Sequence, residues 1–133
     1  GTFRMCRAAY PYLKATSGSI VNLGSTSGQA AVMNTVSYSA SKAGVMFLTK
    51  VLAYEWAADH IRVNAVGPTI VPSDMTASLL SDEKYMNEKL ASIPLGRIAT
   101  QEDVAKSIAF LLSDDAKMIT GQILFIDGGV TIH

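Results

Sequence analysis

The sequence predicts an α/β fold in which a parallel sheet of three strands is flanked by helices. Short apolar segments rich in β-branched residues alternate with longer segments in which apolar residues recur at helical spacing. Each short segment is followed by a turn of small residues or by glycine and proline. Strands that alternate with helices form parallel β-α-β units with right-handed crossovers. The predicted strands are residues 19–24, 61–66 and 122–126.

Four helices are predicted around these strands, at residues 1–15, 36–58, 81–92 and 100–112. The second is apolar over most of its length, which indicates burial on more than one side. We interpret Phe47, Tyr54 and Trp56 on this helix as core residues or subunit contacts. Thr100 and Asp103 are three residues apart and form a capping pair that opens the fourth helix.

The ends of the first two strands point to a shared site. Ser25 directly follows the first strand. Gly67 and Pro68 are expected to break the second strand, and residues 69–80 to form an irregular loop. Parallel sheets bind ligands at the carboxyl ends of their strands. Ser25 and Pro68 are therefore predicted to converge at one edge of the sheet.

Composition bounds the class of protein. The chain has 133 residues, no net charge and 49% hydrophobic residues, which is enough to bury the core of one domain. Balanced charge argues against nucleic acid or an anionic membrane as the main partner. No apolar run approaches the roughly 20 residues that cross a bilayer. We expect a domain that acts on small molecules.

The metal-binding and redox-active residue types are scarce. Cys6 is the only cysteine, so an internal disulfide or a cysteine metal cluster is excluded, and a reducing, cytoplasmic setting fits. His60 and His133 are too few and too far apart in sequence to indicate a metal site. No metal is predicted.

The residues with the clearest chemistry are Ser25, Tyr38 and Lys42. Tyr38 and Lys42 are four residues apart, so on a helix they lie on the same face. A free tyrosine has a pKa of about 10, too high for efficient proton transfer at neutral pH, but a nearby positive charge favours the phenolate. Tyr38 is therefore a candidate general acid or base, with Lys42 as its charged partner. Ser25 would offer a hydroxyl group to the same substrate oxygen.

The pair alone is weak evidence, because many helices carry a surface tyrosine and lysine at this spacing. The context favours catalysis. Tyr38 follows Ser25 by 13 positions, an apolar strand precedes Ser25, and the segment I-R-V-N-A-V-G-P lies downstream. This order resembles the short-chain dehydrogenase/reductase family, whose signature is Ser, then Tyr-x-x-x-Lys, then a strand that ends in a Pro-Gly turn. The resemblance extends from about Gly1 to Gly129.

The resemblance implies that the fold is the C-terminal part of a Rossmann-like doubly wound parallel sheet. Residues 1–133 would form a single domain that carries the catalytic part, with the N-terminal dinucleotide-binding half absent. The chain has no glycine-rich phosphate loop after a first strand and lacks an initiator methionine. We expect the isolated chain to bind cofactor poorly and to turn over little. A complete protein of this family would form homodimers or homotetramers.

The resemblance also implies an activity, namely hydride transfer between NAD or NADP and a carbonyl or secondary alcohol substrate. Tyr38 would donate a proton to the carbonyl oxygen, and Ser25 would hydrogen-bond that oxygen. Lys42 would assist Tyr38 and bind the nicotinamide ribose. The further cofactor-contacting residues that the resemblance implies are Pro68, Thr69, Val71 and Ser73.

Two features leave alternatives open. The family usually has Pro-Gly where this chain has Pro68-Thr69, and Pro-Thr gives a lean towards sugar, polyol or dicarbonyl substrates. A non-catalytic fragment of the same fold, with a binding or structural role, is the second hypothesis. A small β-α-β interaction module with a fortuitous triad is the third.

Overall fold

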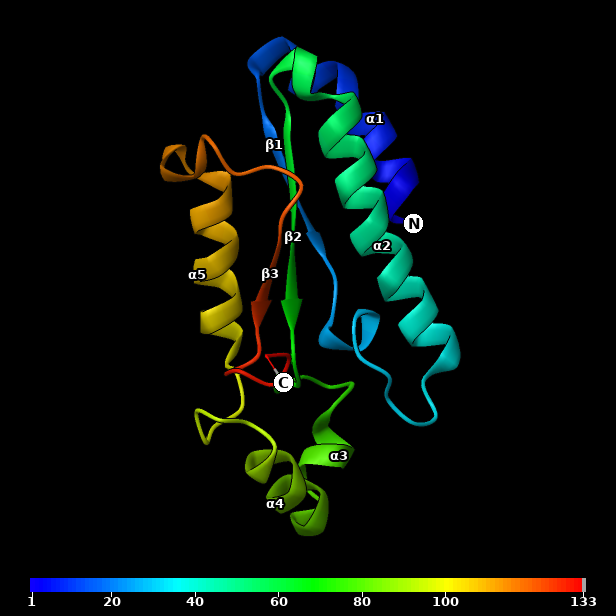
Figure 1. The fold of residues 1–133 in the computed structure, drawn as a ribbon, viewed down its shortest axis with the longest axis vertical. Helices are drawn as coiled ribbons and strands as arrows, with labels where there is room; N and C mark the ends of the chain where they lie inside the picture. Colours follow the sequence, from blue (N-terminus) through cyan, green and yellow to red (C-terminus); the bar gives the residue numbers. More distant parts are fainter. Residues whose placement is uncertain (133) are drawn as a thin grey trace.

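The computed structural model describes residues 1–132 and consists of a three-stranded parallel sheet between layers of helices (Figure 1). The strands β1 (Ser19–Leu23), β2 (Arg62–Pro68) and β3 (Ile123–Ile126) lie side by side in the order β1-β2-β3. Both pairs are parallel. The predicted fold class is confirmed, while His133 lies outside the described residues.

The second strand is longer than predicted, because Gly67 and Pro68 belong to β2 and pair with Phe125 and Ile126 of β3. The expectation that these two residues break the strand is therefore wrong. A Cβ atom at Gly67 would lie 2.7 Å from the ring of Phe125, so a side chain here would force that ring to move. Pro68 is tolerated because it is the last residue of the strand, and the next amide, that of Thr69, donates to the carbonyl oxygen of Ile126.

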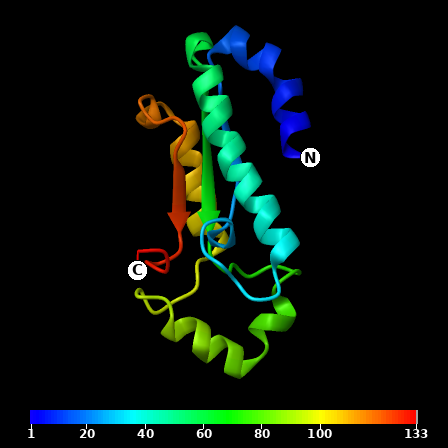
Figure 2. The ribbon, with the colours of Figure 1, turned by 45° about the vertical axis from the view of Figure 1, so that its right-hand side comes forward.

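Helices cover both faces of the sheet. Helices α1 (Thr2–Thr16) and α2 (Val36–Glu55) pack on one face, and α5 (Gln101–Leu112) packs on the other (Figures 1 and 2). Helices α3 (Ala77–Leu80) and α4 (Glu83–Ala91) lie beyond the carboxyl ends of the strands (Figure 1). No helix within residues 1–132 combines the length and apolar character that crossing a membrane requires.

The connections and one helix end differ from the prediction. The predicted loop at 69–80 includes α3, and helix α2 ends at Glu55, ahead of the predicted end at residue 58. Three single turns of 3-10 helix complete the fold, namely η1 (Thr26–Gly28), η2 (Ala57–Asp59) and η3 (Asp114–Ala116). The first of them, η1, follows Ser25 directly and shapes the candidate site.

The main apolar core lies between α1, α2 and the sheet. Its buried residues are Cys6, Leu52, Ala53, Ile61 and Val63. A buried polar chain crosses the same layer: the Cys6 thiol donates to Asn22 Oδ1, and Asn22 Nδ2 donates to Thr49 Oγ1 at 3.0 Å. Because these groups satisfy one another, they join α1 and α2 to β1 without leaving a buried polar atom unpaired.

Only one side of α2 is buried against the sheet, through Met46, Thr49, Leu52 and Ala53. Phe47 and Tyr54 point outward, with exposed fractions of 68% and 88%. The expectation that this helix is buried on more than one side within the chain is therefore wrong. Trp56 does pack against the core and lies 4.9 Å from the ring of Tyr10. A three-stranded sheet offers α2 a single surface, so its opposite face is left to solvent.

Buried or capping side chains hold two further parts of the fold, namely the segment before β3 and the start of α5. Asn64 is fully buried; its Nδ2 donates to the carbonyl oxygen of Ile119 and its Oδ1 accepts from the amide of Gln122. The predicted capping pair is confirmed, because Thr100 and Asp103 form a reciprocal capping box at the start of α5. The Asn64 bonds tie the segment before β3 to the centre of the sheet, and the capping box fixes the start of α5 itself.

Candidate active site

Ser25 lies at the carboxyl end of β1, as predicted, and is 7% exposed. Its extended backbone makes it the N-cap of η1, and its Oγ accepts a hydrogen bond of 3.2 Å from the amide of Ser27. An accepting serine oxygen keeps its own hydrogen available to donate to a second partner. The turn therefore holds Ser25 in one orientation while its hydroxyl group can still bind an acceptor oxygen.

Tyr38 and Lys42 lie on successive turns of α2 and share a face, which confirms the predicted placement. The ammonium nitrogen of Lys42 lies 5.7 Å from the centre of the Tyr38 ring. It also donates a hydrogen bond of 2.9 Å to the carbonyl oxygen of Leu23, two residues before Ser25. Lys42 therefore connects the helix that carries Tyr38 to the strand that leads into Ser25.

Tyr38 is accessible from solvent, with an exposed fraction of 42%. A phenol that donates a proton to a ligand has to be reachable by that ligand. Lys42 is half-buried, and its ammonium group uses the Leu23 carbonyl as an anchor. An ammonium group has three donors, so further hydrogen bonds to a ligand remain possible.

A glycine allows η1 to approach α2 closely. A Cβ atom at Gly28 would lie 2.9 Å from both the backbone nitrogen of Ala43 and the backbone carbonyl carbon of Lys42. Such distances are too short for a side chain, and both contacts are with backbone that cannot move aside. Gly28 is therefore what allows the turn after Ser25 to lie against the helix next to Lys42.

The turn after β2 lies beside the end of β1. The amide of Gly24 donates to the carbonyl oxygen of Val66 at 2.8 Å, so the residue after β1 still lies beside β2. Pro68 is the last residue of β2, and the amide of Thr69 donates to Ile126 at 3.2 Å. Ser25, Pro68 and Thr69 thus lie at the same edge of the sheet, which confirms the predicted convergence. Pro68 reaches this edge within the strand, whereas the prediction had it after the strand's end.

The next residues of this turn are held by Thr76. Its Oγ1 donates to the carbonyl oxygen of Val71 at 2.7 Å and accepts from the amide of Ser73 at 2.9 Å. The Ser73 hydroxyl also lies 3.1 Å from Thr76 Oγ1. Val71 and Ser73 therefore belong to one compact turn, farther along the chain from Ser25 than Pro68 and Thr69.

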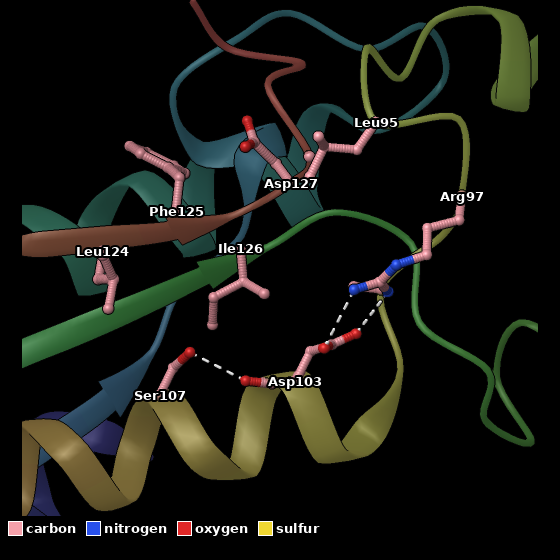
Figure 3. A pocket seen from close by; sticks show the side chains of 10 residues that line it. Leu95, Arg97, Asp103, Ser107, Leu124, Phe125, Ile126 and Asp127 are labelled. Carbon is pink, nitrogen blue, oxygen red and sulfur yellow. Dashed lines mark hydrogen bonds and ion pairs between the residues drawn. The ribbon is translucent and has the colours of Figure 1, made fainter.

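A cavity of about 300 Å³ lies elsewhere, between β3, the start of α5 and the 95–99 segment (Figure 3). None of Ser25, Tyr38 and Lys42 lines it. Arg97 forms two hydrogen bonds with Asp103 across its rim, at 2.7 and 3.3 Å. We therefore distinguish this cavity from the candidate site.

The carboxylates at this cavity are already paired. The Arg97 guanidinium, followed by the amide and hydroxyl groups of Thr100, holds the pKa of Asp103 well below its usual range. Burial opposes ionisation of Asp127, yet hydrogen bonds from Gly129 and Thr131 keep its pKa below the usual value. Asp103 is therefore ion-paired and Asp127 is hydrogen-bonded within its own turn.

Several residues that shape the site were missed by sequence reasoning. The Leu23 carbonyl, Gly28, Thr76 and Gln101 all make contacts that position the site or its turn. Thr76 lies three residues after Ser73, and this local hydroxyl pattern could have indicated a turn. The other three act through backbone atoms distant in sequence, for which no local pattern exists.

The order of these elements, with a serine after β1, a Tyr-x-x-x-Lys pair on α2 and a turn after β2, was compared with known proteins. A family model described as enoyl-(acyl carrier protein) reductase matches residues 1–131. The chain belongs to the short-chain dehydrogenase/reductase family. The resemblance predicted from the sequence is thereby confirmed.

Relatives in this family cover nearly the whole chain. The 3-oxoacyl-[acyl-carrier-protein] reductase of Thermotoga maritima is 44% identical over 133 residues, which are 99% of this chain and 53% of the relative. A 4-hydroxyisoleucine dehydrogenase complexed with NADH has a TM-score of 0.94 at 31% identity and is covered to 55%. A gluconate 5-dehydrogenase from Burkholderia cenocepacia in complex with NADP and tartrate has a TM-score of 0.94 at 26% identity. These two alignments span 99% and 98% of this chain.

The lengths of these relatives differ from that of the chain. The gluconate 5-dehydrogenase is covered to 52%, close to the shares for the other two. The chain therefore spans about half the length of the family members it matches.

Proposed function

We propose that this chain carries the catalytic part of an NAD- or NADP-dependent oxidoreductase that acts on a carbonyl or secondary alcohol substrate. The observation that carries the proposal is the placement of the Lys42 ammonium against the Tyr38 ring, with its anchor on the strand that leads into Ser25. The relatives support the reaction type, since their names are those of reductases and dehydrogenases.

The nicotinamide end of the cofactor fits the residues present. Lys42 uses its Leu23 contact as an anchor and has donors left for the ribose hydroxyl groups. Pro68, Thr69 and Val71 form the turn at the adjacent strand end, where parallel sheets bind such ligands. Bound NAD or NADP supplies or accepts the hydride. The complexes of two relatives with NADH and with NADP support both forms as candidates.

The chemistry of the chain's own residues is proton transfer. In the reducing direction, the Tyr38 hydroxyl donates its proton to the carbonyl oxygen of the substrate. Ser25 donates a hydrogen bond to the same oxygen as negative charge develops there. The Lys42 ammonium stabilises the phenolate that Tyr38 becomes. In the oxidising direction the same groups act in reverse, and the Tyr38 phenolate accepts the proton.

We further propose that the adenosine and pyrophosphate bind to a part of the protein outside these residues. The chain has no glycine-rich phosphate loop after a first strand, and the relatives are about twice as long. Titration of the isolated chain with NADH and NADPH, followed by nucleotide fluorescence, is expected to show little binding. Binding in the micromolar range would contradict this proposal.

The decisive experiment for catalysis is Tyr38→Phe in the complete polypeptide. Loss of the hydroxyl group is expected to lower kcat by roughly 10²- to 10⁴-fold, the usual contribution of a general acid. The fold is expected to persist, because the Tyr38 side chain is 42% exposed. Tyr54→Phe is the matched control, since Tyr54 lies on the same helix and is 88% exposed.

Unchanged turnover in the Tyr38→Phe variant would exclude Tyr38 as the proton donor. Absence of turnover in the unmodified complete polypeptide would favour the second hypothesis, a binding or structural protein with this fold. Thermal unfolding of the Tyr38→Phe variant, measured in parallel, shows whether a loss of turnover comes from a loss of folding. A complete polypeptide that folds normally, binds cofactor and turns over without the Tyr38 hydroxyl group would refute the proposed mechanism.

A further inference from the structure

The segment that leaves β2, residues 70–76, is held mainly by its own hydrogen bonds. Thr76 makes the internal contacts, to the carbonyl oxygen of Val71 and to the amide of Ser73. Across residues 1–132, one hydrogen bond joins this segment to an element distant in sequence. In that bond, Gln101 Nε2 donates to the carbonyl oxygen of Pro72 at 3.0 Å.

The two carbonyl groups involved are consecutive in the chain. Thr76 binds the carbonyl of Val71, and Gln101 binds the carbonyl of Pro72. The first bond closes the turn on itself, and the second ties the closed turn to α5. The start of the connection is tied to β3 by the bond from the Thr69 amide to Ile126, and the Gln101 bond is the tie of residues 70–76 themselves to the packed helix.

Gln101 is well placed to act as a rigid anchor, because it is the first residue of α5. The capping box of Thr100 and Asp103 fixes this end of the helix, and Arg97 reaches across to Asp103 (Figure 3). The body of α5 packs against all three strands. A side chain that starts from this helix end therefore moves with the sheet.

We propose that Gln101 is a positioning residue that fixes the place of the turn after β2 relative to the nicotinamide site. The inference rests on the proposed function, in which Thr69 and Val71 contact the nicotinamide. Gln101 touches neither cofactor nor substrate; it acts through the Pro72 carbonyl. Its loss is expected to weaken cofactor binding while the proton-transfer residues stay in place.

The test compares Gln101→Met and Gln101→Glu in the complete polypeptide. Methionine keeps the length of the side chain and removes the donor. Glutamate also removes the donor, yet an acidic residue in the first turn of a helix is favoured by the helix dipole. Because a neutral hydrogen bond of this kind contributes modestly, both variants are expected to raise the KM and the Kd for the cofactor roughly 2- to 10-fold. We expect kcat to stay within about twofold, because only binding interactions shared by ground state and transition state are lost.

The matched control is Glu102→Met, on the same helical turn. Glu102 is exposed, and within residues 1–132 its one ion pair is with Lys106 on its own helix, at 2.8 Å. This variant is expected to leave the cofactor KM unchanged. Gln101→Glu is also expected to keep or raise the thermal unfolding temperature, which separates lost positioning from lost stability.

Two results would overturn the inference. One is an unchanged cofactor KM and Kd in both Gln101 variants. The other is a fall in kcat at constant KM together with a lower unfolding temperature, which would indicate a structural role alone. Failure of the proposed function is detected separately, by turnover that persists in Tyr38→Phe.

Discussion

Lys42 holds its ammonium nitrogen 5.7 Å from the centre of the Tyr38 ring, one helical turn away on the same face of α2. The hydrogen bond from Lys42 to the Leu23 carbonyl keeps it there. In the complete polypeptide, Lys42→Met is expected to lower kcat/KM by roughly 10²-fold or more, because it removes the charge that supports proton transfer by Tyr38. Steady-state kinetics over a range of substrate concentrations, from well below KM to saturation, measures the effect.

Lys50→Met is the control for this prediction, because Lys50 is an exposed lysine on the same helix. Its removal is expected to leave turnover unchanged. Equal losses in both variants would mean that the helix responds to any lost lysine and that Lys42 has no special role.

Gly28→Ala is expected to displace the turn that carries Ser25. The added methyl group would lie 2.9 Å from backbone atoms of Ala43 and Lys42, so the turn or the helix has to shift. Because misplacing a catalytic group by about 1 Å can cost roughly 10²-fold in rate, we expect a fall in kcat of about that size. Kinetics and thermal unfolding of the same preparation check it.

The control for Gly28 is Gly44→Ala. Gly44 lies inside α2, and a Cβ atom there would meet nothing within 4 Å. Alanine in a helix interior is favoured over glycine by about 1 kcal/mol, so this variant is expected to unfold at a higher temperature with normal turnover. Normal turnover in Gly28→Ala would show that the close approach is not required for catalysis.

The pairing of Asp103 with Arg97 and Thr100 predicts a loss of stability in acid. Because these partners hold the pKa of Asp103 well below its usual range, the folded state binds its proton more weakly than the unfolded state, where the pKa is about 3.9. The stabilisation is therefore complete above about pH 4 and is lost as the pH falls through the folded-state value. Thermal unfolding measured from pH 7 downwards is expected to show this loss.

Asp103→Asn is expected to lower the unfolding temperature at pH 7 and to flatten its decline in acid. Glu102→Gln serves as the control, because Glu102 is an exposed neighbour in the same helical turn and is ion-paired with Lys106. An acid profile identical to that of the unmodified protein would exclude Asp103 as its source.

Asn64→Leu is expected to be strongly destabilising. Asn64 is fully buried, and its removal leaves the Ile119 carbonyl and the Gln122 amide without their partner. Burying two unpaired polar groups costs about 2–4 kcal/mol in the free energy of unfolding. Urea unfolding measures it, with the exposed Gln122→Leu as a control that is expected to change little. A loss below about 0.5 kcal/mol, the range of ordinary surface changes, would contradict the assignment.

Local patterns in the sequence predicted most of the elements. The alternation of apolar strands with helices predicted the three parallel strands and the helices that flank them. The four-residue spacing of Tyr38 and Lys42 predicted their shared helix face, and Thr100 with Asp103 predicted the capping box. Each of these depends on residues close together in the chain, so the backbone geometry of one element is sufficient to predict it. The catalytic and cofactor-binding roles of the site residues stay predictions.

The wrong predictions depended on contacts between distant segments. Gly67 and Pro68 looked like a break, yet the strand continues because both residues pair with β3, at Phe125 and Ile126. The apolar content of α2 predicted burial on more than one side, yet the sheet covers only the side opposite Phe47 and Tyr54. That these two residues are subunit contacts, the other half of the interpretation, stays a prediction. A local pattern indicates which backbone conformation a segment prefers, but it does not indicate which distant segment packs against it.

The sequence by itself determined which residue types could form the site and how they are spaced. They are a serine after a strand, a tyrosine and a lysine one helical turn apart, and a turn after the next strand. Tertiary structure alone brings the Leu23 carbonyl to Lys42, the backbone of α2 against Gly28 and the Gln101 side chain to Pro72. These three contacts join segments 14 to 29 residues apart and involve backbone atoms, which every residue type possesses. Because no side-chain pattern marks a backbone partner, such contacts follow only from the packed fold.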